Sequence, residues 1–214
     1  MAQVPTGSTF YIASAYGSAK TVTIVTNATE AVVTAVAHGF SNGDVVEMTS
    51  GWGRLNKRHF EIESVLTDSF VLSGEDTTNT TFYPVGTGIG SVRKATTFTQ
   101  ITSVMNPQSS GGDPKTVTYK FVESDVEYSI NDGFGATSYT MELDAEALGS
   151  AGYTALTSLT QVQTDTCLKV VTRSGSRVYQ PCTVALNESI RMQDGQINRV
   201  TCAFNGNNRL TRAS

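Results

Sequence analysis

The stretch "TVTIVTNATEAVVTAVAHGFSNGDVVEMTS", residues 21–50, decides the fold class of this chain. Valine and threonine dominate it, and such β-branched residues suit a half-buried pleated sheet better than a helix. The valine runs are broken by "NATE" and "HGFSNG", whose Asn, Gly and Ser residues are typical of turns. The pattern predicts short strands at residues 21–27, 31–37 and 44–50.

The alternation of short strand candidates and turns continues after residue 50. "HFEIESV" (59–65) and "DSFVLSG" (68–74) are two further strand candidates, and the glycine-rich segment "VGTGIGSVRK" (85–94) follows them. A compact unit of about five strands in this length fits a small β-barrel. Turn signals every eight to twelve residues favour sandwiches or barrels over helical folds.

The remaining chain predicts further strands and one helix. "DAEALGSAGYTALTSLTQ" (144–161) is the helix candidate, with Asp144 as its N-terminal cap, and "SGS" (174–176) predicts a hairpin turn. The expected fold class is therefore all-β with one short helix. The strand candidates are "ATTFTQITSVM" (95–105), "TVTYKFV" (116–122), "VEYSI" (126–130), "SYTMELD" (138–144), "CLKVVTR" (167–173), "VYQPCTVALNESI" (178–190) and "QINRVTCAFNG" (196–206).

Composition excludes several function classes. Hydrophobic residues make up 39% and charged residues 16% of the 214 residues, and the net charge of −4 does not attract nucleic acid. The sequence has no apolar run of 18 residues and its first ten residues lack the pattern of a signal peptide, so we expect no membrane insertion by this chain. Cys167, Cys182 and Cys202 show no CxxC spacing, and we expect reduced structural thiols.

The motif "AHGFSNGDVVEM" (37–48) combines a histidine, two glycines and an aspartate, and so raises the question of catalysis. A catalytic histidine needs an orienting partner and a nucleophile, and neither His38 nor His59 lies in a G-x-S-x-G or H-E-x-x-H context. We interpret the segment as a surface turn in which glycine permits the change of direction. The residues of this structural turn are His38, Gly39, Asn42, Gly43 and Asp44.

Two other motifs have competing interpretations. "VGTGIGS" (85–91) resembles a phosphate loop, but no helical pattern follows it and no P-loop lysine is present. "VESDVEYSI" (122–130) places Glu123, Asp125 and Glu127 on one face if it is a strand, with Val126 and Tyr128 facing a core. Paired carboxylates can hydrolyse glycosides and acidic clusters can bind calcium, whereas a solvated acidic face is the simpler interpretation. We expect neither a metal nor a cofactor.

The ordered series of segments resembles a known family. Residues 21–91, with "HGFSNGDVV", "RLNKRHFEI" and "DSFVLSGEDTT", resemble a small β-barrel module of phage structural proteins, similar in fold to the first catalytic-cysteine half-domain of ubiquitin-activating enzymes. The flanks "MAQVPTGSTFYIASAYGSAK", "TTFTQITSV", "SSGGDPKTVTYKFVESDVEYSI", "LGSAGYTAL" and "VYQPCTVALNESIRMQDGQINRVTCAF" resemble the tail tube protein of long-tailed, non-contractile bacteriophages. Residues 131–150 match that pattern least closely.

The resemblance implies both a domain organisation and an assembly. Residues 1–19 and 94–214 would form the tail tube β-sandwich, and residues 20–93 an inserted barrel that projects from the outer wall. Six copies would form a ring whose inner strands merge into one barrel. The rings would stack around a tape-measure protein and end at a tail terminator, and phage DNA would pass through without sequence-specific binding. The expected location is the virion tail, after synthesis in the host cytoplasm.

Two sets of residues are candidates for this assembly. The Pro, Gly and Ser residues of 106–115 predict a long loop, which we expect to contact the next ring. The acidic residues Glu123, Asp125 and Glu127 are candidates for the channel lining, because residues 121–168 contain no Lys or Arg. The residues of the inter-ring loop candidate are Asn106, Pro107, Gln108, Ser109, Ser110, Gly111, Gly112, Asp113, Pro114 and Lys115.

Two alternatives to a tail tube protein stay open from the sequence. The first is another tail or head–tail component, such as a terminator or a decoration protein, which would stop at one ring where a tube protein forms long filaments. The second is a glycan hydrolase that uses Glu123 or Asp125. The sequence lacks any other catalytic constellation, so the first expectation is a structural protein and not an enzyme.

Overall fold

A computed structural model describes residues 6–213 of the chain, and within this range the fold is β-strands with one α-helix. The predicted class, all-β with one short helix, is confirmed. The strands are β1 (Thr9–Tyr16), β2 (Lys20–Val22), β3 (Ile24–Val25), β4 (Val32–Thr34), β5 (Val45–Ser50), β6 (Arg58–Glu63), β7 (Ser69–Leu72), β8 (Gly90–Ile101), β9 (Val104–Gly111), β10 (Pro114–Tyr119), β11 (Tyr128–Phe134), β12 (Thr137–Asp144), β13 (Thr166–Val171), β14 (Arg177–Arg191), β15 (Arg199–Gly206) and β16 (Thr211–Ala213).

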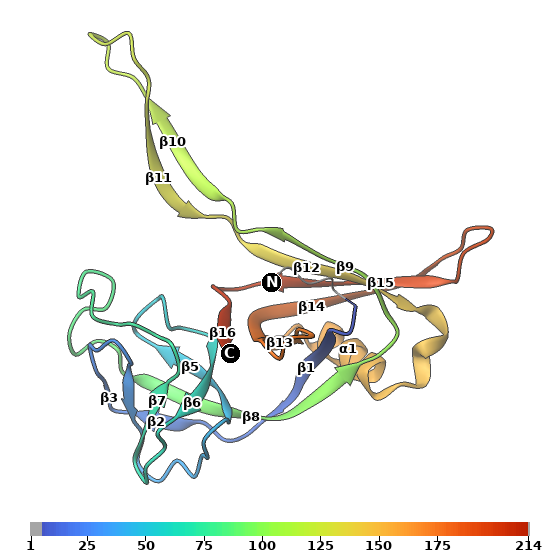
Figure 1. The fold of residues 1–214 in the computed structure, drawn as a ribbon, viewed down its shortest axis with the longest axis horizontal. Helices are drawn as coiled ribbons and strands as arrows, with labels where there is room; N and C mark the ends of the chain where they lie inside the picture. Colours follow the sequence, from blue (N-terminus) through green and yellow to red (C-terminus); the bar gives the residue numbers. More distant parts are fainter. Residues whose placement is uncertain (1–5, 214) are drawn as a thin grey trace.

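Most strands join one curled sheet, in the order β3-β4-β7-β6-β5-β8-β1-β13-β14-β15-β12-β9, with β16 beside β14 and β2 beside β8. The strand β8 connects the two halves of this sheet. Its first part pairs with β5, for example Lys94 with Val46, and its second part pairs with β1, for example Ile101 with Phe10. Strands β10 and β11 form a separate two-stranded sheet that projects far from the rest (Figure 1).

Two large hydrophobic cores lie on either side of the middle of β8. The first core, within residues 22–92 and here called the barrel core after the barrel that the sequence predicts for this region, includes Trp52, Phe60 and Phe70, which are almost fully buried. The body core packs α1 (Ala151–Val162) against β1, β8 and β14 and includes Met141 and Phe204. The five strand candidates between residues 21 and 74 are all present, except that β2 and β3 divide the first of them.

The predicted helix is interrupted. Asp144 does act as a cap, since its Oδ1 accepts a hydrogen bond from the Glu146 amide, but the element that it begins is a short 3₁₀ helix, Ala145–Gly149. The α-helix α1 begins one residue after Ser150, whose Oγ accepts from the Tyr153 amide. The prediction of one helix over 144–161 was wrong at this point, because Ser150 provides a second N-terminal cap and the chain turns between the two elements.

Close packing of α1 on β8 depends on Gly152. A Cβ at this position would lie 2.4 Å from the Gln100 carbonyl oxygen and 2.9 Å from Ile101 Cα, both of which belong to the β8 backbone. A backbone cannot yield as a flexible side chain can, so any larger residue forces the helix away from the sheet. Gly149, in contrast, has no heavy atom within 4 Å of such a Cβ.

We therefore expect Gly152→Ala to lower the free energy of unfolding by about 1–3 kcal/mol, through the displacement of α1 from β8. Gly149→Ala is the matched control and should stay within about 0.5 kcal/mol of wild type. Urea denaturation of the two variants, followed by circular dichroism, makes the measurement. Equal stability of the two variants would contradict the packing argument.

Candidate assembly surfaces

The sheet formed by β9, β12, β15 and the end of β14 carries its core on one face only. Along β12, Met141 and Leu143 are buried in the body core, whereas Thr140 and Glu142 point to the opposite face. The strand registers place the following side chains together on that opposite side, here called the polar face: Met105, Gln108, Ser110, Ser138, Thr140, Glu142, Asp144, Thr183, Ala185, Asn187, Arg191, Arg199, Thr201, Ala203 and Asn205. Asn106 joins them at a register irregularity of β9, through its hydrogen bond to Glu142. Most of these residues are small hydroxyl or amide residues without charge.

The charged residues of the polar face lie together. Glu142 Oε2 accepts hydrogen bonds from Arg199 Nη1 at 2.8 Å and from Asn106 Nδ2 at 2.6 Å, and Glu142 Oε1 lies 3.9 Å from Arg191 Nη1. The hydrogen bond from Asn106 lowers the pKa of Glu142 against the opposing effect of burial, and Arg199 and Arg191 lower it further. Asp144 is engaged instead with the Glu146 amide. The alternation of "SYTMELD" and "INRVTCAFN" indicates which residues share a face of each strand, but the cluster itself was not predicted, because the pairing of the strands decides which charged residues meet.

Strand β9 is an edge of this sheet. Within residues 6–213 it pairs with β12 on one side and with no strand on the other. Pro107 lies within β9, and an edge strand tolerates proline because an amide on the outer side needs no ladder partner. An unpaired edge offers backbone donors and acceptors to another strand.

The prediction of a loop at 106–115 was wrong. Asn106 to Gly111 belong to β9, Pro114 and Lys115 begin β10, and only Gly112 and Asp113 join the two strands. Gly111 and Gly112 have φ angles of 78° and 79°, a backbone region that favours glycine. The glycines therefore redirect an extended chain from the main sheet into the projecting hairpin, whose strands are β10 and β11, and do not form a loop.

The projecting hairpin, residues 114–134, is here called the arm. Pro114 pairs with Phe134 at its base and Tyr119 with Tyr128 near its end. Its apolar side chains are exposed, and Tyr119, Phe121 and Tyr128 form a ring cluster with centroids 5.3–6.0 Å apart. The exposed apolar residues of the arm are Val117, Tyr119, Phe121, Val122, Val126, Tyr128, Ile130 and Phe134. Such a concentration of exposed apolar groups marks an interaction surface.

The acidic residues lie at the tip of the arm, not on a sandwich strand. Glu123, Asp125 and Glu127 are exposed and belong to the turn between β10 and β11. Val126 and Tyr128, expected to face a core, are 57% and 43% exposed. The acidic residues were predicted to lie on a strand, and this was wrong: of residues 122–130 only Tyr128 to Ile130 belong to a strand, β11, and the residues before them form a turn without a core beneath it. The three carboxylates are not part of the polar face.

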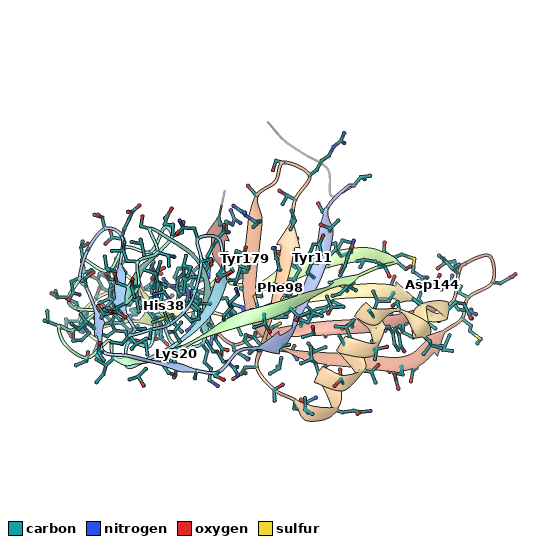
Figure 2. All side chains as sticks on the ribbon, turned by 90° about the horizontal axis from the view of Figure 1, so that it is seen from below. Tyr11, Lys20, His38, Phe98, Asp144 and Tyr179 are labelled. Carbon is teal, nitrogen blue, oxygen red and sulfur yellow. The ribbon has the colours of Figure 1, made fainter. Side chains whose placement is uncertain are left out.

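The structure places the residues of the predicted turn close together. His38 Nδ1 accepts from the Phe40 amide at 3.0 Å, and Nε2 lies 3.0 Å from the Leu66 carbonyl oxygen, which requires a proton on Nε2. Asp44 Oδ2 accepts from the Ser41 amide, Asn42 Oδ1 accepts from Val65, and Gly39 and Gly43 have positive φ. His38 is only 5% exposed, so the expectation of a surface histidine was wrong (Figure 2 places it within the barrel).

We expect His38→Asn to lower the free energy of unfolding by about 1–3 kcal/mol, since the shorter side chain leaves Phe40 N–H or Leu66 C=O without its partner in a buried site. Ser41→Ala, an exposed change in the same turn, is the control and should be nearly neutral. Chemical denaturation gives both values. A neutral His38→Asn would show that the histidine does not hold the turn.

The glycine-rich segment 85–91 packs against the barrel core. A Cβ at Gly88 would lie 2.9 Å from the Trp52 ring, and the Trp52 indole N–H donates to Pro84 O at 2.8 Å and to Thr87 Oγ1 at 3.0 Å. The glycines thus let the backbone cross a buried tryptophan. Cys167, Cys182 and Cys202 are buried free thiols, and burial raises the pKa of Cys182 to about 12. Within the described residues, no group of His, Cys, Asp or Glu is arranged to hold a metal ion.

A mainly polar seam holds the barrel against the body. Tyr179 Oη donates to Glu61 Oε2 at 3.1 Å, Lys57 Nζ donates to Asp165, and Arg58 Nη2 donates to Thr211 Oγ1 on β16. Around Tyr179, a small apolar cluster joins the two halves (Figure 2 shows Tyr179 beside Phe98 and Tyr11). The barrel therefore has direct side-chain contacts with the body in addition to the continuous strand β8.

His59 lies fully buried in the same seam. Its Nε2 is 2.9 Å from the Tyr16 hydroxyl, and burial lowers the pKa of His59 to about 3, with the charge of Arg93 adding to the effect. The unfolded chain, with an ordinary histidine pKa near 6.5, binds the proton first as the pH falls. Stability from the neutral ring is therefore complete above about pH 6.5 and is lost as the pH falls toward 3.

We expect the wild type to lose on the order of 2 kcal/mol between pH 7 and pH 5 through His59 alone. His59→Gln can still accept the Tyr16 hydrogen bond but does not titrate, so its stability should fall less over the same window. Urea denaturation of both proteins at pH 7, 6 and 5 provides the test, in which carboxylates contribute equally to both. Parallel pH dependences would rule out a buried neutral His59.

The fold and these surfaces define a class: an all-β protein with a polar sheet face, an open sheet edge and an apolar arm is built for assembly. A family model for the phage tail tube protein matches residues 50–214, well over half of the chain. The chain belongs to the phage tail tube protein family, and it is a structural protein of the virion tail. The matched region begins inside the barrel, at the end of β5.

Two of the solved structures that match this chain are similar to it at low sequence identity. One belongs to the tail of an empty gene transfer agent particle refined with helical C6 symmetry, at 12% identity and a TM-score of 0.44, with 55% of this chain and 87% of that chain covered. The other, from the virion of a native gene transfer agent particle, has the same identity and TM-score and is covered to 89%. These values carry no argument about assembly. No curated protein matches the chain.

Proposed function

We propose that this chain forms rings of six subunits that stack into the tail tube, and that the polar face lines its channel. The observation that carries this proposal is the four-stranded sheet of β9, β12, β15 and β14, which has a core on one face and mostly uncharged polar side chains on the other. A face that lines a water-filled channel needs polar side chains, and a face in contact with DNA must not bind phosphate strongly.

The free edge of β9 supports lateral association within a ring. Pairing of this edge with a strand of the neighbouring subunit would satisfy its backbone groups and would extend the sheet from one subunit into the next. Closure of the sheet around the ring would leave no edge.

The arm is the proposed contact between rings. It extends the earlier candidate 106–115, since its first residues continue directly from β9. Its exposed apolar residues would be buried on a subunit of the adjacent ring, and the carboxylates at its tip would stay in water. At its base, the Arg209 guanidinium lies 5.3 Å from the Phe134 ring centre, so one end of the arm is anchored on the body.

The remaining expectations belong to the same proposal. A tape-measure protein would occupy the channel during assembly, a terminator would end the stack, and DNA would pass through later without sequence-specific binding. Residues 20–93 would form an inserted barrel that projects from the outer wall, and its likeness to the half-domain of ubiquitin-activating enzymes stays a prediction. Catalysis is not proposed, because Glu123 and Asp125 lie in an exposed turn that offers no wall for a substrate.

The arm provides the sharpest test. Removal of residues 115–133, with an Asn-Gly turn joining Pro114 to Phe134, cuts the hairpin at a pair that is already in register. We expect the shortened protein to form separate rings or monomers, whereas the wild type forms long tubes, because the apolar contact to the next ring is absent. Negative-stain electron microscopy and sedimentation velocity distinguish these states.

The control is Glu123→Gln with Asp125→Asn and Glu127→Gln, which keeps the apolar surface of the arm and should still form tubes. Tubes of normal length from the shortened protein would contradict the role of the arm. Single rings from the wild type would favour a terminator over a tube protein.

A further inference from the structure

Two arginines on the polar face lie close together with a single carboxylate between them. Arg191 on β14 and Arg199 on β15 are directly opposite each other in register. Like charges directly opposite on neighbouring strands are unfavourable unless a third group offsets them. Glu142, on the next strand β12, reaches Arg199 at 2.8 Å and Arg191 at 3.9 Å.

The carboxylate is held in place, whereas one guanidinium stays accessible. Asn106 Nδ2 donates to Glu142 Oε2, and the Glu142 side chain is 16% exposed. The Arg191 side chain is 66% exposed, whereas the Arg199 side chain is 20% exposed and its Nη2 donates to Gln196 Oε1. Donors for an anion are therefore present on this face, and Glu142 occupies the position between them.

We propose that Glu142 is a charge-masking residue, which prevents Arg191 and Arg199 from binding the phosphate groups of DNA. Guanidinium groups bind phosphate and carboxylate with the same paired geometry, so the carboxylate of Glu142 competes directly for the donors that a phosphate oxygen would take. This part of the inference concerns the subunit alone and does not depend on where the polar face lies in the tube.

The consequence for DNA rests on the proposed function. In a ring of six, two arginines per subunit would place about twelve guanidinium groups around the channel. Each contact between a guanidinium and a phosphate increases the affinity for DNA and makes that affinity depend more steeply on the salt concentration. With Glu142 present, the four charged residues of the polar face sum to zero, two Arg against Glu142 and Asp144. Asp144 cannot replace Glu142 as a mask, because its carboxylate caps the 3₁₀ helix that follows β12.

The test compares phosphate binding by full-length wild type and Glu142→Gln. The probes are inorganic polyphosphate and a 20-base-pair DNA duplex, titrated by fluorescence anisotropy at several salt concentrations. We expect Glu142→Gln to bind both probes about tenfold or more tightly than wild type, since one or two charge-assisted contacts become available. For DNA, the slope of log K against log salt should steepen by about 0.9 for each freed arginine.

Two variants separate masking from a general change of charge. Glu30→Gln removes one carboxylate from an exposed site in the barrel, so it should leave binding at the wild-type level. Glu142→Gln combined with Arg191→Gln and Arg199→Gln should return binding to that level. Equal binding by Glu142→Gln and Glu30→Gln would overturn the proposal, and so would tight binding by the triple variant.

Folding and channel position are checked separately. If thermal melting shows Glu142→Gln to be unfolded, Glu142→Met fills similar space without a charge. It then replaces Glu142→Gln in the comparison with Glu30→Gln and in the triple variant. Binding of the duplex by free Glu142→Gln subunits but not by assembled tubes would support the mask and would contradict the placement of the polar face in the channel. If Glu142→Gln forms normal tubes but binds the probes no more tightly than wild type, the masking role is wrong and the proposed function still stands.

Discussion

The antiparallel register of β12 with β15 is the constraint on which the surfaces of this protein depend. It is unbroken from Ser138↔Asn205 to Asp144↔Arg199. Because side chains alternate along a strand, this register sends Met141 and Leu143 into the body core with Cys202 and Phe204, and it leaves Glu142 on the polar face. A slip by one residue would bury the polar set and expose the apolar set. The core therefore fixes the polar face indirectly, through the register.

Strand pairing also joins the barrel to the body. Strand β8 belongs to both halves, so neither can rotate freely while its ladder with β5 and β1 is intact. The seam adds polar contacts, among them Tyr179 with Glu61 and Arg58 with Thr211. Hydrogen bonds of this kind contribute about 1 kcal/mol each, and several of them suffice to hold an orientation that one covalent linker would leave open. A projecting barrel on a tube wall would thus keep a fixed direction.

The sequence predicts the elements that bury a hydrophobic core and fails where no core exists within the subunit. Valine and threonine alternation located the barrel strands, and the class with one helix is confirmed. Residues 106–115 were assigned to a loop because local Pro, Gly and Ser signals are all that composition offers there. In the structure, pairing with β12 makes Asn106 to Gly111 a strand, and such long-range pairing is invisible in local composition.

The arm and its acidic tip are a second region where the prediction fails because the subunit has no core there. Alternation in 122–130 was interpreted as a strand with one buried face, but Val126 and Tyr128 have no core to enter. The apolar residues that the pattern detected are exposed on the arm, and in the proposed tube they would contact another subunit. The Glu142 cluster was not predicted because Glu142 on β12 is far in sequence from Arg191 and Arg199, and only the pairing of β12 with β15 brings the carboxylate to them.

In the proposed tube, exposed apolar residues on the arm and masked charges on the polar face would serve two opposite requirements of one chain. A tube subunit must bind its own copies firmly, and burial of apolar area supplies that free energy without attracting a polyanion. The channel must instead have no strong affinity for the phosphate backbone, and each unmasked arginine would add a salt-dependent contact. Arginine on the polar face is compatible with this requirement only while a carboxylate in fixed geometry pairs with the guanidinium group. The two surfaces are therefore separate: the apolar residues lie on the arm, and the electrically neutral set lies on the sheet, where the register of β12 places it.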